Sequence, residues 1–152
     1  MDLVVDASIA VMWFVPEPHS ITAKEILTRD GTLHAPDLFR AEVVSVLCRK
    51  IQIEELKADE GREAVNAFIQ LPVRFHPTAD LLVPAFEIAL ESRQYVYDCV
   101  YLMLAAQLNI GMVTADRRFY KAIQKTEFRN HIGWIEDALA TGVSNTEAAR
   151  FT

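Results

Sequence analysis

Short apolar runs alternate with longer amphipathic stretches along the chain, and the short runs predict four or five strands. Residues 2–6, DLVVD, end in an acid, as a buried parallel strand does before its loop. Comparable runs occur near 33–35, at 72–77 and at 111–114, and HIGWI at 131–135 is the candidate for a fifth strand. Gly, Pro and acidic residues bound these runs, which is typical of strand ends.

Helical periodicity fills the intervals between the strands. ASIAVMWFVPEP predicts a brief helix or turn that stops at its prolines, and residues 19–29 follow as a helix. Further helices are predicted over 38–51 with Asp37 as N-cap, over 57–70, from a Thr78 cap to Ser92, over 98–108, and, short and basic, from 117. Strands that alternate with helices in this way predict a three-layer α/β/α sandwich with a mainly parallel sheet of four to five strands.

Two of these helices show the face that we expect to enter the core. The helix over 57–70 carries apolar residues at core spacing, namely Ala58, Val65, Phe68 and Ile69. The helix that ends at Ser92 has an apolar-to-small stripe, namely Leu81, Leu82, Ala85, Ile88, Ala89 and Ser92. Cys48 and Cys99 lie inside apolar helical segments, so we expect both to be reduced, buried thiols.

Length and composition favour one domain. We place that domain at 1–143 of the 152 residues, followed by a polar C-terminal tail at 144–152. The hydrophobic content of 51% and the mean hydropathy of +0.13 indicate either a large core or an apolar surface that awaits a partner. No apolar run reaches the roughly 18 residues of a membrane span. The first residues are acidic rather than basic, so we expect a cytoplasmic protein without membrane contact.

The charge is negative overall but unevenly distributed. A net charge of −6 argues against a surface coated for nucleic acid, yet residues 117–129 hold five basic residues against Glu127 alone. Arg117, Lys121 and Lys125 follow at i, i+4 and i+8, either as a solvated helix face or as a strip that touches phosphates. The four histidines are scattered without a nucleophile at catalytic spacing, so we expect them to have surface or structural roles.

Four acids stand where the predicted fold would bring them together. Asp6 ends the first strand and Asp116 lies just beyond the fourth, and ligands of open parallel sheets gather at the carboxyl ends of strands where the strand order reverses. Asp98 and Glu42 would join from the first turns of two flanking helices. Each acid alone has an ordinary explanation as a helix cap or a partner of the helix dipole. Their apolar surroundings, VVSVL after Glu42 and CVYLMLAAQL after Asp98, favour the joint interpretation.

A cluster of buried carboxylates needs compensating charge. Desolvation and mutual repulsion would otherwise protonate it. A divalent cation removes this difficulty, and oxygen ligands without His or Cys favour Mg²⁺ or Mn²⁺ with several waters retained. Such an ion can orient a phosphodiester and make a water more acidic.

Three sequence blocks resemble, in order, the conserved blocks of PIN-domain proteins, and most closely those of the VapC group of toxin–antitoxin ribonucleases. The blocks are VVDASIAVMWFVPE, APDLFRAEVVSVLCRK and VYDCVYLMLAAQLNIGMVTADRRF, and the likeness runs from residue 2 to about 135. The family's four acids fall, in order, on Asp6, Glu42, Asp98 and Asp116. Ser8 and Thr114 match its supporting hydroxyl residues. Arg118 stands where some members carry another Asp, which leaves four acids rather than five.

The resemblance implies a parallel sheet between helices and a Mg²⁺- or Mn²⁺-dependent endoribonuclease. In that mechanism a metal-activated water attacks a phosphodiester of RNA and leaves a 5′-phosphate. The resemblance also implies a homodimer and a small antitoxin whose C-terminal segment covers the active-site groove. Arg117, Arg118 and Lys121 are candidates for RNA contact, and the two arginines are alternatively candidates for an acidic antitoxin residue. Arg40 is a further phosphate contact or, alternatively, a member of a surface ion pair.

Other functions fit less well. A phosphatase with an aspartyl nucleophile generally wants a second Asp two residues after the first, and Ser8 stands there. A phosphoacceptor domain would want a Lys at the end of its last strand, where HIGWI offers none. A non-catalytic PIN-like interaction or scaffold module remains as the alternative, and the four intact acids speak against it.

Overall fold

A single parallel sheet organises the chain. The computed structural model describes residues 1–139, and within them the sheet contains β1 (Leu3–Val5), β2 (Leu33–Pro36), β3 (Val73–His76), β4 (Gly111–Thr114) and β5 (Ile132–Trp134). The five strands are all parallel and lie in the order β3-β2-β1-β4-β5. The predicted parallel sheet and its strand number are confirmed. The predicted tail at 144–152, and its boundary with the domain, lie outside the described residues.

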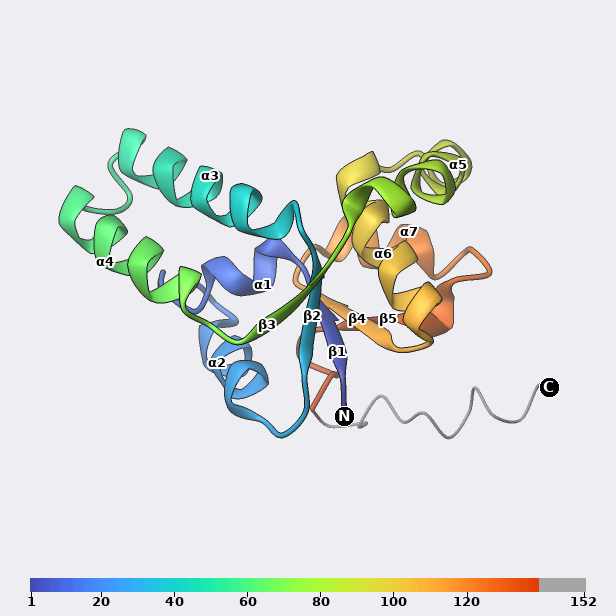
Figure 1. Ribbon diagram of the computed structural model, residues 1–152, viewed down its shortest axis with the longest axis horizontal. Helices are drawn as coiled ribbons and strands as arrows, with labels where there is room; N and C mark the ends of the chain where they lie inside the picture. Colours follow the sequence, from blue (N-terminus) through green and yellow to red (C-terminus); the bar gives the residue numbers. More distant parts are fainter. Residues whose placement is uncertain (140–152) are drawn as a thin grey trace.

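The direction of the chain across the sheet reverses once, and this reversal divides the helices between the two faces. From β1 the chain steps to β2 and β3, with α1 (Ala7–Val11), α2 (Ser20–Thr28), α3 (Phe39–Gln52) and α4 (Ala58–Ile69) on one face. It then returns through α5 (Leu82–Ser92) and α6 (Val96–Leu108) on the other face to β4 (Figure 1). Crossovers between parallel strands are nearly always right-handed, so a reversed step moves the helices to the opposite face.

Three shorter segments complete the described chain. The helix α7 (Arg117–Ile123) joins β4 to β5 and packs against β5. The 3₁₀ turns η1 (Thr78–Leu81) and η2 (Arg129–His131) precede α5 and β5. Within residues 1–139, no helix is long and apolar enough to cross a membrane.

The helix α6 forms the centre of the core. It packs on β1, β2 and β4, and every residue from Cys99 to Ala105 is buried, as its apolar sequence predicted. The helix begins at Val96 with Tyr95 as N-cap, two residues before the predicted start at Asp98. Asp98 therefore lies within the first turn of a buried helix instead of capping it.

The predicted helix caps at Asp37 and Thr78 are wrong, because each side chain bonds to the segment of the other. The carboxylate of Asp37 accepts a hydrogen bond from the Thr78 N–H at 3.1 Å, and the Thr78 hydroxyl accepts one from the Leu38 N–H at 3.2 Å. Leu38 is the N-cap of α3, and Pro77 is that of η1. The paired strands β2 and β3 end side by side, which puts the side chains of Asp37 and Thr78 within reach of each other's segment.

The face that α4 buries is narrower than predicted. Phe68 is buried as expected, but Ala58 is exposed and Ile69 is 56% exposed. The buried residues are Gly61, Ala64 and Phe68, at i, i+3 and i+7. The helix packs mainly on α3, so a narrow stripe of two small residues and Phe68 is enough to cover the contact.

Two further burial predictions fail in part. Cys99 is buried, and burial raises the pKa of its thiol to about 12, but Cys48 is exposed. On α5 the residues Leu81, Ala85, Ile88 and Ala89 are buried as predicted, whereas Leu82 is exposed. Leu82 and Cys48 each follow a buried residue directly in sequence, but neighbouring positions of a helix point in different directions, and these two side chains face away from the core.

We predict that Phe39→Ala destabilises the protein by about 3–5 kcal/mol, as is usual for a buried Phe. Phe39 is fully buried, and its ring contacts those of Phe68 (centroid distance 5.4 Å) and Tyr101 (6.3 Å), which join α3 to α4 and α6. Urea unfolding measures the change. Ile69→Ala is the matched control and should cost about 0.5 kcal/mol or less, because the side chain is exposed. Equal losses in the two variants would contradict this assignment of the core.

Candidate active site

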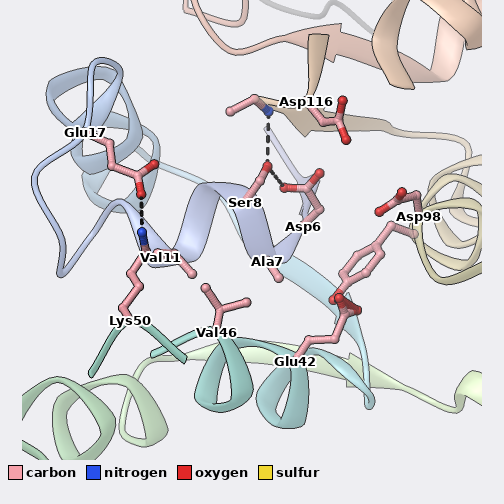
Figure 2. Close-up of a pocket in the computed structure, with 12 residues that line it drawn as sticks. Asp6, Ala7, Ser8, Val11, Glu17, Glu42, Val46, Lys50, Asp98 and Asp116 are labelled. Atoms are coloured by element: carbon pink, nitrogen blue, oxygen red, sulfur yellow. Dashed lines mark hydrogen bonds and ion pairs between the residues drawn. The ribbon is translucent and has the colours of Figure 1, made fainter. Parts of the chain in front are cut away.

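A pocket of about 400 Å³ lies where the strand order reverses, at the carboxyl ends of the neighbouring strands β1 and β4. All four predicted acids line it, each from a different segment: Asp6 follows β1, Glu42 is on α3, Asp98 is on α6 and Asp116 follows β4. Figure 2 shows Asp6, Asp98 and Asp116 around one end of the pocket and Glu42 rising toward them from α3. The structure therefore brings the four acids together.

Asp6 is fixed by its own loop. It is the N-cap of α1, and its Oδ1 accepts a hydrogen bond from the Ile9 N–H at 3.2 Å. The Ser8 hydroxyl donates to the same oxygen and accepts a hydrogen bond from the Ala115 N–H at 3.2 Å. Ser8 therefore ties the loop after β1 to the loop after β4 (Figure 2).

Asp116 is held in the same way at the start of α7. Its Oδ1 accepts a hydrogen bond from the Phe119 N–H at 3.0 Å, and its own N–H donates to the hydroxyl of the buried Thr114 at 3.1 Å. The ordinary cap explanation thus holds for Asp6 and Asp116 alongside their position in the pocket. Capping in each case engages Oδ1, so Oδ2 makes no cap bond.

Glu42 depends on a residue that sequence reasoning missed. The hydroxyl of Tyr101 donates a hydrogen bond to Glu42 Oε1 at 3.0 Å, across the interface between α6 and α3. Tyr101 lines the pocket and is almost fully buried. It lies three residues after Asp98, on the same face of α6. The spacing of three residues from Asp98 could have indicated Tyr101 from the sequence. Its apolar neighbours made it read as a core residue instead.

The electrostatic cost of the cluster appears in the pKa values of its members. Burial, followed by the charges of Asp6, Asp116 and Glu42, raises the pKa of Asp98 from 3.8 to about 7. Burial also raises the pKa of Asp6, against the hydroxyls of Ser8 and Thr114, which lower it.

The pKa values of Glu42 and of its hydrogen-bond partner Tyr101 are also raised. Burial raises the pKa of Glu42, while the bond from Tyr101 opposes the increase. Burial and the neighbouring acids raise the pKa of the Tyr101 phenol, which keeps it protonated as a donor. The four acids differ in exposure, because Asp6 is buried, Glu42 and Asp98 are half-buried, and Asp116 is exposed.

The donor set suits a hard divalent cation that keeps part of its water shell. All four side chains offer carboxylate oxygens, and positive charge between them would relieve the repulsion that raises the pKa of Asp98. Across the described range 1–139, no three His, Cys, Asp or Glu side chains already stand close enough together to hold an ion. Such partly open sets are typical of Mg²⁺, which is bound by one or two carboxylates and several waters.

The predicted basic contacts lie outside the pocket. The Arg40 guanidinium stacks 4.1 Å from the centroid of the Phe75 ring, and that of Arg117 stacks 4.2 Å from the centroid of Trp134. Arg118 and Lys121 are exposed on α7. The predicted stripe is wrong in its last member, because α7 ends at Ile123, before Lys125. Two charged residues that sequence reasoning missed do line the pocket, namely Glu17 and Lys50.

The sequence of this chain is similar to those of known proteins. The PIN-domain family model matches residues 3–124. Ribonuclease VapC3 of Pyrobaculum aerophilum is 32% identical over 120 residues, covering 78% of this chain and 92% of the relative. Ribonuclease VapC9 of Mycobacterium tuberculosis is 34% identical over 116 residues, covering 76% and 87%.

Solved structures agree with this fold. VapC20 of Mycobacterium tuberculosis, described as a sarcin-ricin loop cleaving toxin, matches with a TM-score of 0.61 at 19% identity over 79% of this chain and 94% of its own. PAE2754 of Pyrobaculum aerophilum matches with a TM-score of 0.63 at 17% identity over 92% and 93%. Sequence and fold together define the class, and the chain belongs to the PIN-domain family and, within it, to the VapC ribonucleases. The predicted resemblance is confirmed.

We predict that Asp98 makes the metal-free protein less stable as the pH rises from about 4 to about 8. Its pKa is about 7 when folded and near 3.8 when unfolded, so between these values the folded state binds more protons. Relative to wild type, Asp98→Asn should therefore gain stability at pH 8 compared with pH 4, by about 2 kcal/mol after allowance for solvent screening of this half-buried group. Urea unfolding in EDTA measures the difference.

Asp80→Asn, an exposed acid outside the pocket, is the control and should track wild type at both pH values. A constant gap between wild type and Asp98→Asn would mean that the pocket does not disfavour the charge on Asp98.

Proposed function

We propose that this chain is a VapC-type endoribonuclease toxin that hydrolyses phosphodiester bonds of RNA at the four-carboxylate pocket, with Mg²⁺ or Mn²⁺ as cofactor. The observation that carries the proposal is the position of Asp6, Glu42, Asp98 and Asp116, which come from four distant segments and line one pocket. The relatives named as ribonucleases favour this function over a non-catalytic interaction module.

The residues of the pocket have distinct roles in this proposal. The four carboxylates would hold the cation, which when bound would supply positive charge for the phosphodiester oxygens and make a water more acidic. Ser8 joins the loop of Asp6 to the loop of Asp116, and the Thr114 hydroxyl accepts a hydrogen bond from the Asp116 N–H. Tyr101 orients Glu42. Burial and the neighbouring acids raise the pKa of Asp98, and a cation between the carboxylates would favour its charged form.

Basic residues outside the pocket would act at its approaches. Arg40 and Arg117 each use one guanidinium face to stack on an aromatic ring, and a stacked guanidinium keeps its N–H edges for phosphate or carboxylate. We assign these two, with Arg118 and Lys121, to contacts with RNA or with an acidic residue of a small cognate antitoxin. The antitoxin would cover the pocket, and the pair would act in the cytoplasm.

The proposed homodimer has a candidate surface on α5. Leu82, Val83, Phe86 and Leu90 are exposed on this helix, and Tyr95 and Tyr97 are exposed where α6 begins. This exposed group supports the proposal, because an apolar patch on a helix face is typical of an interface.

We predict that the purified chain cuts structured RNA only with added Mg²⁺ or Mn²⁺, and not in EDTA. Asp6→Asn and Asp98→Asn should each lower the rate by at least about 100-fold, because even outer-shell residues of metal sites cost up to that much. Gel analysis of end-labelled RNA measures the rate and identifies the end group. Asp80→Asn should cut like wild type. Cutting that persists in both pocket variants would belong to a contaminant and remove the proposal.

The same variants test the toxin role in cells. Expression of the wild-type chain should arrest growth, Asp98→Asn should not, and co-expression of the antitoxin should restore growth. Normal growth with the wild-type chain alone, together with cleavage in vitro, would leave a nuclease without a toxin role.

We predict that Phe86→Glu converts the dimer to a monomer, because the introduced charge would be buried at the interface. Light scattering after gel filtration measures the mass. Ile21→Glu is the matched control, since Ile21 is exposed on α2, away from the α5 surface, and this variant should stay dimeric. A monomeric wild type, or a dimer that survives Phe86→Glu, would reject this surface as the interface.

A further inference from the structure

The pocket continues beyond the four acids along one face of α3. Glu42, Val46 and Lys50 follow at intervals of four residues, all three line the pocket, and Figure 2 shows them side by side on the helix. Eight residues of helix place Lys50 about 12 Å from Glu42 along the helix axis. Val11 of α1 and Val46 form an apolar section between the two charged ends.

Lys50 is the one cation among the described residues that lines this pocket. Its Nζ lies 3.0 Å from Glu17 Oε1 and 3.1 Å from Glu55 Oε2. The bond from Glu17 is the main cause of a raised Lys50 pKa, so the amine stays charged. The side chain of Lys50 is only 17% exposed, whereas that of Glu17 is 34% exposed.

We propose that Lys50 forms a phosphate subsite of the pocket and binds a backbone phosphate of the RNA strand on one side of the bond that is cut. This inference rests on the proposed function. Glu17 and Glu55 both hold the amine of Lys50 until RNA arrives, and the phosphate then replaces Glu17, which lines the pocket. Ion pairs near the surface are weak because water screens both charges, and a phosphate carries a full charge on several acceptor oxygens.

The negative charge of the pocket favours such a group. The carboxylates repel the RNA backbone wherever the cation does not neutralise them, so a strand that crosses the pocket gains from a positive contact away from the reacting bond. The basic residues on α7 and Arg40 lie outside the pocket and do not supply it there.

The decisive comparison is between Lys50→Met and Glu17→Gln, because both remove the ion pair between Lys50 and Glu17; Lys50→Met also removes the pair with Glu55. If Lys50 binds phosphate, Lys50→Met raises the KM for a single-stranded RNA about tenfold with little change in kcat, as expected for the loss of a charged hydrogen bond. Glu17→Gln removes the carboxylate that competes with the phosphate inside the pocket, leaves Glu55 on the amine, and lowers the KM. If the pair only ties α3 to the loop before α2, both variants lose the same contact and shift KM and stability in the same direction.

Three further measurements complete the test. Lys50→Arg should keep most of the wild-type KM, because the charge is retained. Lys24→Met, an exposed lysine of α2 outside the pocket, controls for net charge and should leave the KM unchanged. The slope of log affinity against log salt should fall by about 1 in Lys50→Met and not in Lys24→Met. Fluorescence anisotropy on the Asp98→Asn background measures this slope without cleavage.

Each outcome separates this inference from the proposed function. Wild-type cleavage with an unchanged KM and salt slope in Lys50→Met overturns the subsite and leaves the nuclease. An unchanged KM with weaker inhibition by the antitoxin makes Lys50 an antitoxin contact and also overturns it. A wild type that never cuts removes the proposed function, and the salt slope alone then decides whether Lys50 binds RNA.

Discussion

The repulsion between four carboxylates is the constraint on which the pocket depends. Burial and three neighbouring charges raise the pKa of Asp98 to about 7, and burial raises the pKa values of Asp6 and Glu42 as well. A chain free to relax would separate these groups. In this protein the four acids stay together, because hydrogen bonds from groups outside the cluster hold them in place. Asp6 and Asp116 are held by the backbone N–H groups that begin α1 and α7, and Glu42 by the phenol of Tyr101.

Core packing and the site share the same residues. Phe39 packs on Phe68 and Tyr101, and it lies three residues before Glu42 on the same helix. Tyr101 in turn belongs to α6, the buried helix that carries Asp98. The aromatic contacts therefore set the distance between α3 and α6 and, through it, the distance between two of the acids. Folding free energy is used here to hold like charges together, which is a common feature of functional sites.

The sequence predicted the features that depend on strand ends and on long apolar periods. DLVVD and GMVT were correctly predicted as strands, and the acids that follow them led to Asp6 and Asp116; the structure shows that the two strands are neighbours. Contacts between segments distant in sequence were not predictable in this way. Asp37 and Thr78 each read as a local cap, and only the pairing of β2 with β3 lets them exchange bonds.

The same limit explains why Tyr101 and Lys50 were overlooked. Tyr101 reads as one more apolar position, and Lys50 as the solvated end of an amphipathic helix. Their roles depend on which face of α6 and of α3 borders the pocket, which the helical period alone does not define.

The two ends of the pocket differ in stiffness as well as in charge. The acids at the sheet are short side chains, and two of them are bonded to the backbone at helix starts, so their oxygens have little freedom. Bond cleavage requires that precision, because small displacements of the reacting groups slow the reaction strongly. Lys50 stands on a flexible four-carbon stem and has an exchangeable partner in Glu17. A phosphate away from the reacting bond occupies slightly different places in different strands, and in the proposed function a flexible cation serves such a substrate better than a fixed one. The pocket thus pairs a rigid end suited to chemistry with an adaptable end suited to binding the strand.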